Sequence, residues 1–378
     1  MYNKIDVSFK LCERKILMKD KSKRIMYLGN FGGKKEVETS QVKKTVSICN
    51  YLLKKGYVVY KVNSELLKSP LFLFILIKII YVWIRTDVAI VSLNQNGLRF
   101  GHYFFLNILT KLKFRKKLFF ITIGGWLPDF IIDNPKTINY FNKFDRIYVQ
   151  TQKIQDLLID IGINNTLVMW NFRDYDFDIL NKHIQKVLLN KHNNTNPIRL
   201  VFFAIIKKEK GLSIAIDAIN KVNKKYKMKI YDLDIIGPVA SNDYITEFNN
   251  LIENNKEVCN YKGVISEQNC IYETLSKYDS MIFPTYYKGE GFPTVIVEAF
   301  ISGLPVIASD WKYNSEIVKD RVNGLIFSLD KCDLAEKLEW LQHNRNILRD
   351  MKLNCLQEAK KYHTDTILRN LVNDIENI

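Results

Sequence analysis

Short apolar runs alternate with longer amphipathic stretches along most of this 378-residue chain. In the first half the apolar runs predict strands, and helical patterns lie between them from Thr39 onward, over 70–84 and over 98–113. The predicted strands of this half cover 24–28, 57–62, 87–93, 118–123, 145–151 and 166–172. Strands that alternate with helices form parallel sheets with helices on both faces, so we expect an α/β fold.

The alternation restarts after a polar stretch that carries no strand pattern and contains one helical piece. The second set of predicted strands covers 199–206, 231–238, 261–264, 280–285, 304–309 and 323–327. We therefore predict two tandem Rossmann-like, doubly wound domains with an interdomain cleft. The expected parts are an N-terminal domain at 1–172, a linker at 173–196, a C-terminal domain at 197–360, and a C-terminal helix at 361–378 that packs back on the N-terminal domain.

The net charge of +16 is confined to the N-terminal half. Residues 1–196 hold 32 Lys and Arg against 15 Asp and Glu, whereas residues 197–378 hold 24 against 25. A basic surface attracts nucleic acid, anionic lipid or a phosphorylated ligand, although a solvated lysine-rich surface is the simpler explanation. The apolar stretch Pro70–Ile84 is too short to span a bilayer and predicts a helix that is either buried or lies in a membrane interface.

Cysteine usage and the N-terminal stretch both favour a cytoplasmic setting. The six cysteines form no CxxC pair, and no histidine spacing completes a zinc site. The first residues lack the uninterrupted apolar core of a secretory signal peptide.

The segment with the clearest chemistry is YKGEGFPTVIVEAFISGLPVIASDW, Tyr287–Trp311. Glu290 follows a predicted strand, and Pro293 opens a predicted helix, where its missing N–H costs nothing. Free amides at a helix start bind anions, phosphate above all. Glu290 can accept hydroxyls of a sugar, and Glu298 can accept both hydroxyls of a ribose. Together these features predict a site for a sugar joined through a diphosphate to a nucleoside, below called the donor. The donor-binding candidates are Gly237, Gly291, Phe292, Pro293, Thr294, Val295 and Glu298.

Residues 279–311 resemble the signature of the retaining nucleotide-sugar glycosyltransferases of family 4, which have the GT-B fold. In that family two glutamates at this spacing flank the donor, which implies roles for Glu290 at the sugar and Glu298 at the ribose. The stretch FFAIIKKEKG at 202–211 resembles a second signature, in which Lys210 matches the lysine that binds the donor diphosphate. The resemblance thus implies Glu290 and Lys210 as the catalytic pair. The amino-acid sequence of residues 283–317 is similar to the corresponding part of enzymes that build bacterial capsular and surface polysaccharides.

Three places depart from the family pattern, and one is the first glycine loop, where Lys34, Lys35, Glu36 and Val37 stand in place of further glycines. Ile205 stands where the family usually has an arginine, and Lys207 or Lys208 is the nearest substitute charge. Gly124-Gly125-Trp126 stands where many members carry a histidine near the donor sugar, so we assign no catalytic histidine. A lone histidine such as His102 is more often structural.

Glycine turns after two strands of the N-terminal half predict the acceptor site. Glycine lets a ligand approach the backbone, an indole face stacks on sugar rings, and a carboxylate accepts hydroxyls. A strand turn with a buried tryptophan is the competing interpretation. The acceptor candidates are Gly32, Gly33, Gly125, Trp126 and Asp129.

These observations predict a glycosyltransferase that moves a sugar from a nucleoside diphosphate sugar, with a UDP-sugar favoured, to a hydroxyl of a growing lipid-linked surface oligosaccharide. We expect a retaining mechanism, no cofactor, no metal and no nucleic acid, with the protein peripheral on the inner face of the plasma membrane and an anionic membrane surface as partner. Asp232-Leu-Asp234 fits strand alternation better than a metal loop. The alternatives are a nucleotide-sugar epimerase on the same fold and a basic nucleic-acid-binding protein, which would need a recognition motif that is missing here.

Overall fold

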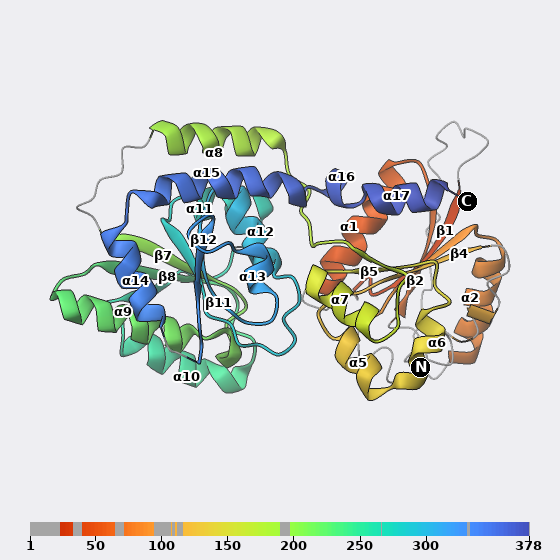
Figure 1. Ribbon diagram of the computed structural model, residues 1–378, viewed down its shortest axis with the longest axis horizontal. Helices are drawn as coiled ribbons and strands as arrows, with labels where there is room; N and C mark the ends of the chain where they lie inside the picture. The colour runs from red at the N-terminus through yellow and green to blue at the C-terminus, as the bar shows by residue number, and fades with distance from the viewer. Residues whose placement is uncertain are drawn as a thin grey trace, which may run out of the picture.

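The computed structural model describes residues 23–32, 40–64, 72–93, 107, 110–111, 116–189, 197–265, 267–330 and 333–377. Two lobes lie side by side, each built around its own six-stranded sheet (Figure 1). Every strand pairing in both sheets is parallel, which confirms the expected α/β fold with two doubly wound domains.

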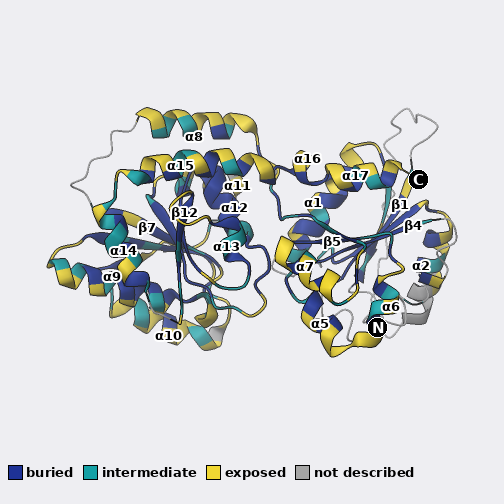
Figure 2. Cartoon of the chain, viewed as in Figure 1, coloured by how far each residue is buried: buried dark blue, intermediate teal, exposed yellow. Residues whose placement is uncertain are grey.

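The N-terminal sheet has the strand order β2-β1-β3-β4-β5-β6. Its strands are β1 (Arg24–Gly29), β2 (Val58–Asn63), β3 (Val88–Ser92), β4 (Lys117–Ile121), β5 (Arg146–Val149) and β6 (Thr166–Val168). Its helices are α1 (Ser40–Lys54), α2 (Phe72–Ile84), α5 (Leu127–Asp133), α6 (Ile138–Phe141) and α7 (Gln152–Asp160). The inner strands β3 and β4 are almost continuous apolar runs because both faces of the sheet are covered there, as the buried strands in Figure 2 show.

The C-terminal sheet has the order β12-β11-β10-β7-β8-β9. Its strands are β7 (Ile198–Phe203), β8 (Tyr231–Ile236), β9 (Cys259–Tyr261), β10 (Ser280–Phe283), β11 (Val306–Ser309) and β12 (Gly324–Phe327). Its helices are α8 (Phe177–Leu189), α9 (Leu212–Tyr226), α10 (Asn242–Glu253), α11 (Gln268–Leu275), α12 (Thr294–Ile301), α13 (Asn314–Ile317), α14 (Leu334–His343) and α15 (Ile347–Ala359).

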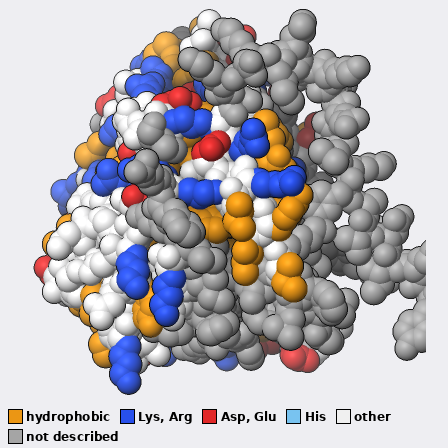
Figure 3. Space-filling view, turned by 90° about the vertical axis from the view of Figure 1, so that its right-hand side faces the viewer, with side chains coloured by type: hydrophobic (Ala, Val, Ile, Leu, Met, Phe, Trp, Pro, Cys, Tyr) orange, Lys and Arg blue, Asp and Glu red, His pale blue; other side chains and the backbone are white. Residues whose placement is uncertain are grey.

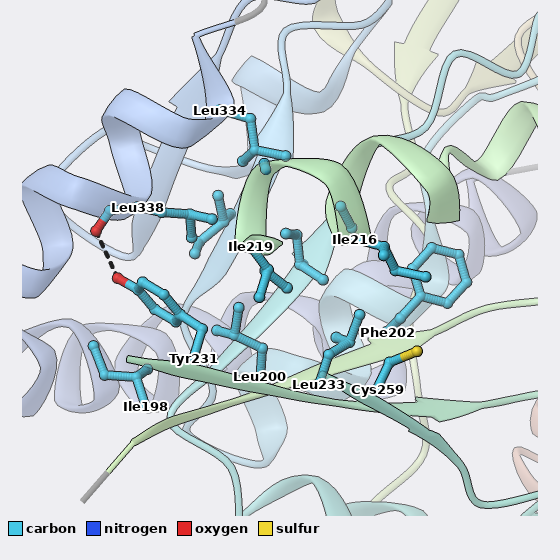
Figure 4. Close-up of a cluster of buried hydrophobic side chains, with 14 of the residues drawn as sticks. Ile198, Leu200, Phe202, Ile216, Ile219, Tyr231, Leu233, Cys259, Leu334 and Leu338 are labelled. Atoms are coloured by element: carbon cyan, nitrogen blue, oxygen red, sulfur yellow. Dashed lines mark hydrogen bonds between the residues drawn. The ribbon is translucent and has the colours of Figure 1, made fainter. Parts of the chain in front are cut away.

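The C-terminal core shows why this sequence forms these layers. Alternate residues of β8 and the apolar face of α9 enclose one cluster between sheet and helix, completed by α14 (Figure 4). Tyr231 is fully buried there, and its hydroxyl donates a 2.6 Å hydrogen bond to the carbonyl of Leu338, so the polar end of the ring is satisfied.

The chain crosses between the lobes twice. It leaves the N-terminal lobe through residues 169–176 and returns after α15 as α16 (Thr364–Ile367) and α17 (Arg369–Glu376). The apolar side chains of Leu368, Leu371 and Ile375 join the cluster under the N-terminal sheet. Asp374 adds polar ties to the same lobe, since it accepts hydrogen bonds from Arg146 at 3.2 Å and from the Tyr148 hydroxyl at 2.6 Å.

Some predicted boundaries were wrong. The short edge strand β9 covers Cys259–Tyr261 rather than 261–264, because Gly263 adopts φ +80 and turns the chain away from the sheet. The strand expected at 166–172 ends at Val168, where the chain begins its crossing between the lobes. Most of the helix expected at 98–113 lies outside the described residues. No helix in the described ranges combines the length and apolar character needed to cross a membrane.

Candidate functional site

The candidate donor site lies where the C-terminal sheet changes direction. The chain builds β7, β8 and β9 toward one edge, and then β10, β11 and β12 toward the other, so β7 and β10 are neighbours at the switch point. Ligands of doubly wound sheets bind beyond the carboxyl ends of the strands at this point. The loop that carries Lys210 follows β7, and the loop that carries Glu290 follows β10. The topology therefore brings together two motifs that are 80 residues apart.

A glycine with positive φ sets the path of the Lys210 loop. Gly211 has φ +74, and a Cβ atom there would lie 2.1 Å from the carbonyl oxygen of Pro284. The loop can therefore lie directly against the segment that leaves β10 only because this residue is glycine. The amide of Tyr286 donates to the carbonyl of Glu209 at 2.8 Å and holds the two loops together.

Lys210 and Glu290 form one ion pair. The Lys210 ammonium lies 2.5 Å from Oε2 of Glu290, and their side chains are only 13% and 10% exposed. The Thr285 hydroxyl donates to the same oxygen at 3.1 Å. The sequence predicted that these two side chains bind separate groups, Lys210 a diphosphate and Glu290 a sugar. The structure shows instead that the two groups share a short charge-assisted contact.

Lys207 supplies a further positive charge at this place. Its ammonium lies 3.1 Å from the centre of the Tyr287 ring, and burial lowers its pKa from the ordinary value. Lys208, by contrast, is exposed and pairs with Glu247 at 3.8 Å. Ile205, at the position where an arginine was expected, is about half exposed. Of the two lysines considered as substitutes for that arginine, Lys207 is the one that lies in the site.

Glu298 is buried on α12 and is held by an arginine that the sequence reading did not identify. Nε of Arg173 donates to Oε1 of Glu298 at 2.8 Å, and Nη2 forms an ion pair with the same oxygen at 2.7 Å. Arg173 belongs to the segment that crosses between the lobes, 125 positions away from Glu298. Neither the spacing nor the composition of the linker indicated this contact.

Two carboxamides of the N-terminal lobe hold the peptide of Phe292. Oε1 of Gln150 accepts the Phe292 amide at 3.3 Å, and Nδ2 of Asn171 donates to the Phe292 carbonyl at 2.6 Å. Nε2 of Gln150 also donates to Oδ1 of Asn171 at 2.9 Å, and all three residues are buried. The sequence reading assigned the Phe292 amide to the ligand, whereas in the structure this amide is occupied by Gln150. Both carboxamides follow strands of the N-terminal sheet, and only this position in the sequence could have indicated that they belong to the site.

The glycine turn after β4 meets the donor loop at backbone distance. A Cβ atom on Gly125 would lie 2.9 Å from the carbonyl oxygen of Glu290, and one on Gly291 would lie 2.9 Å from the amide nitrogen of Gly125. Tyr313 closes the same contact, since its side chain would meet a Cβ on Gly125 at 2.8 Å. These glycines therefore let the two lobes touch directly beside Glu290.

The remaining donor candidates surround this contact. Pro293 is the N-cap residue of α12 rather than its first helical residue. The amides of Thr294 and Val295 have no hydrogen-bond acceptor within the described residues, so they remain available to an anion. Gly237 has φ +146, and a Cβ there would lie 1.8 Å from the carbonyl oxygen of Ala204. It therefore permits the close approach of the chains that leave β7 and β8.

The acceptor candidates are only partly brought together. Gly32 forms a turn in which its amide donates to Oδ1 of Asn30 at 2.8 Å, and Gly33 lies outside the described residues. Trp126 is half-buried, and its indole N–H donates to the Ile123 carbonyl at 2.7 Å. The Asp129 side chain is 70% exposed and lies 3.8 Å from the ammonium of Lys312 in the other lobe.

Carboxylates considered as metal ligands have other partners. Asp232 pairs with Lys229 at 2.8 Å, and Asp234 accepts the Tyr278 hydroxyl at 2.8 Å, both on β8 as the strand pattern predicted. Over the described parts of the chain, no group of three acidic, histidine or cysteine side chains is arranged to hold a metal ion.

Comparisons with known proteins identify similar families and folds. Residues 185–361 match the family model described as glycosyl transferases group 1. A segment of 114 residues, 30% of this chain, is 28% identical to N,N'-diacetylbacillosaminyl-diphospho-undecaprenol alpha-1,3-N-acetylgalactosaminyltransferase of Campylobacter jejuni and spans 29% of that protein.

Similar solved structures extend over nearly the whole chain. One is Anabaena HepE in complex with UDP-glucose, with 16% identity, a TM-score of 0.67, and coverage of 94% of this chain and 100% of that one. Another is the sucrose-phosphate synthase of Thermosynechococcus elongatus, with 13% identity, a TM-score of 0.69, and coverage of 94% and 98%. At these identities the likeness shows a shared fold, which confirms the expected GT-B architecture.

Proposed function

Because residues 185–361 match the family model of the glycosyl transferases group 1, we propose that this chain belongs to that family and transfers a sugar from a UDP-sugar to a hydroxyl of a lipid-linked oligosaccharide, with retention of the anomeric configuration. The observation that carries the proposal is the buried contact of Lys210 with Glu290 beside the start of α12. The complexes of the structural neighbour HepE with UDP and UDP-glucose support a uridine donor.

Each group of site residues would bind a different part of the donor. Lys210, with Lys207 near it, would neutralise the diphosphate as negative charge develops on the leaving group. The amides of Thr294 and Val295 would bind the same phosphates at the helix start. A diphosphate at Lys210 takes over hydrogen bonds that Glu290 now receives, and this frees the Glu290 carboxylate for sugar hydroxyls. No step of this scheme requires a metal ion.

The first experiment is a thermal-shift panel with UDP, GDP and ADP, with and without EDTA. A ligand at about a hundred times its dissociation constant adds about 2.7 kcal/mol to the folded state. We expect a shift with UDP that EDTA leaves unchanged. If no nucleoside diphosphate raises the melting temperature, the donor-site assignment is wrong. Transfer is then distinguished from epimerisation by the products: a transferase releases UDP only when an acceptor is present, whereas an epimerase leaves the nucleotide sugar intact.

We place the lipid-linked acceptor and the membrane at the end of the N-terminal lobe that carries α2. Figure 3 looks onto this end and shows hydrophobic side chains next to Lys and Arg side chains. Three large apolar side chains of α2 are exposed, Ile77 at 66%, Tyr81 at 52% and Ile84 at 67%. The Arg85 guanidinium lies 4.2 Å from the centre of the Tyr81 ring. An apolar stripe beside cationic groups is suited to an anionic bilayer surface.

One basic side chain near α2 is not available for contact with lipid. The Lys116 ammonium donates to the carbonyls of Trp83, Ile84 and Thr86, so it caps the end of α2 instead of facing a lipid. We therefore test the apolar stripe. The double variant Ile77→Glu/Ile84→Glu should lose sedimentation with phosphatidylserine-containing vesicles, while Ile132→Glu should not, because Ile132 is equally exposed but lies on α5. Equal vesicle binding by both variants would exclude α2 as the membrane contact.

A further inference from the structure

We propose that Arg173 is a positioning residue for the nucleotide ribose: it orients Glu298 and ties ribose binding to the segment that crosses between the lobes. This inference rests on the proposed function, since it assigns a ribose to Glu298. It adds a residue outside both sequence signatures and a physical link between donor binding and domain arrangement.

The backbone of Arg173 lies where the outgoing and returning chains meet. Its amide donates to the carbonyl of Tyr362 at 3.0 Å, and its carbonyl accepts the amide of Thr364 at 3.2 Å. These two bonds form a parallel bridge with His363, just before α16 enters the N-terminal lobe. Arg173 therefore joins the two chain segments that connect the lobes.

The side chain of Arg173 uses only one oxygen of Glu298. Its Nε donates to Oε1, and its Nη2 lies 2.7 Å from the same oxygen, whereas Oε2 has no protein donor among the described residues. The guanidinium thus fixes the position of Oε1 and leaves Oε2 to accept a ribose hydroxyl. The two side chains are 19% and 9% exposed, so removal of the arginine leaves a buried carboxylate without its counter-charge. Such a carboxylate is no longer held in one orientation, so its hydrogen bonding to a ribose changes.

The segment that positions Glu298 also positions the donor loop. Asn171, two residues before Arg173, holds the Phe292 carbonyl, and Phe292 lies in the loop that carries Glu290. A single stretch of three residues therefore contacts the E-x7-E motif at Phe292, two residues after Glu290, and at Glu298. Rotation of this stretch would move the sugar and ribose contacts together.

The test measures the discrimination between UDP and 2′,3′-dideoxy-UDP by titration calorimetry. The wild-type protein should bind UDP about tenfold or more tightly than the dideoxy analogue, because one or two charge-assisted hydrogen bonds are lost. Arg173→Gln should bind UDP about tenfold more weakly and should bind the two ligands nearly equally. Glu298→Gln should behave in the same way, and the double variant should be no weaker than either single variant. Arg173→Lys, which keeps the charge without the fork, should fall between Arg173→Gln and wild type.

The matched control is Arg146→Gln. Arg146 also ties the returning chain to the N-terminal lobe, through Asp374 at 3.2 Å, but it lies at the start of β5, away from the carboxyl ends of the strands. This variant should keep the wild-type discrimination. Full discrimination in Arg173→Gln, or an equal loss in Arg146→Gln, would overturn the positioning role. If Arg173→Gln does not fold, as judged by circular dichroism, Arg173→Lys carries the test. Failure of the wild-type protein to bind any nucleoside diphosphate would refute the proposed function itself, which is a different result.

Discussion

Lys44 offers a sharp test of the energetics of the N-terminal lobe. It lies on the second turn of α1 and is buried, and its ammonium has no hydrogen-bond partner in the described part of the structure. Desolvation by burial lowers its pKa from 10.5 to about 7. Burial of a lysine without a counter-charge is costly, so we predict that Lys44→Met makes the protein more stable at neutral pH.

The sign and size of the effect follow from proton linkage. The unfolded chain keeps the Lys44 proton up to about pH 10.4, whereas the folded chain releases it near pH 7. Between these values the unfolded state binds more protons, so the contribution of Lys44 to stability becomes more unfavourable as the pH falls. The difference between the two pKa values corresponds to at most about 5 kcal/mol at pH 7. The advantage of the methionine variant should shrink by about 1.4 kcal/mol for each pH unit above 7.

The assay is urea unfolding of both proteins at pH 7, 8 and 9, followed by tryptophan fluorescence and circular dichroism. Tyrosines and cysteines with raised pKa values titrate alike in both proteins, so the difference between the two curves isolates Lys44. Lys43→Met is the matched control, because Lys43 is the adjacent residue of α1 but is exposed. A stability difference that does not change with pH, or a gain in Lys43→Met of the same size, would refute the argument from buried charge.

Three further predictions concern the donor site. Asn171→Ala should destabilise the fold by about 2 kcal/mol, since it leaves the buried Phe292 carbonyl and the Gln150 amide unpaired; thermal unfolding checks this. Gly211→Ala should lower the free energy of unfolding by about 2 kcal/mol or more and weaken UDP binding, because its φ is +74 and Pro284 leaves no room for a methyl group. Thermal unfolding and calorimetry on the same variant check this, and a loss of stability without a loss of UDP binding would show that the reasoning is wrong. Lys207→Met should weaken UDP binding about tenfold, while a methionine at the exposed Lys208 should not, as measured by calorimetry.

The fold was predictable because its determinants are local. Strands such as β3 are buried along their whole length and therefore appear as apolar runs. The strand boundaries that were predicted wrongly lie where the chain crosses between the lobes and at the edge of a sheet. β6 has only three residues, because the next residues leave the sheet for the other lobe. The residues of edge strand β9 are largely exposed, so burial imposes little pattern on them.

The candidate site was only half predictable, for a related reason. Glu290, Glu298 and Lys210 sit in stretches whose glycines, proline and helix start are visible in sequence. Gln150 and Arg173 are ordinary polar residues in their own neighbourhoods. They acquire a role only because the lobes meet, at sequence separations of 142 residues to Phe292 and 125 to Glu298. No periodicity or spacing encodes a contact of that kind.

The interlobe contacts change how the donor motif should be understood. Read as a sequence, the motif belongs to the C-terminal domain alone. In the structure, Gln150 and Asn171 fix one of its peptides, and Arg173 of the crossing segment fixes one of its carboxylates, so residues outside the C-terminal lobe help to set the shape of the candidate donor site. Gly125, which touches the Glu290 carbonyl, completes this dependence. Substitutions in the N-terminal lobe should therefore alter donor affinity even when no acceptor is present, which a site confined to one domain would not allow.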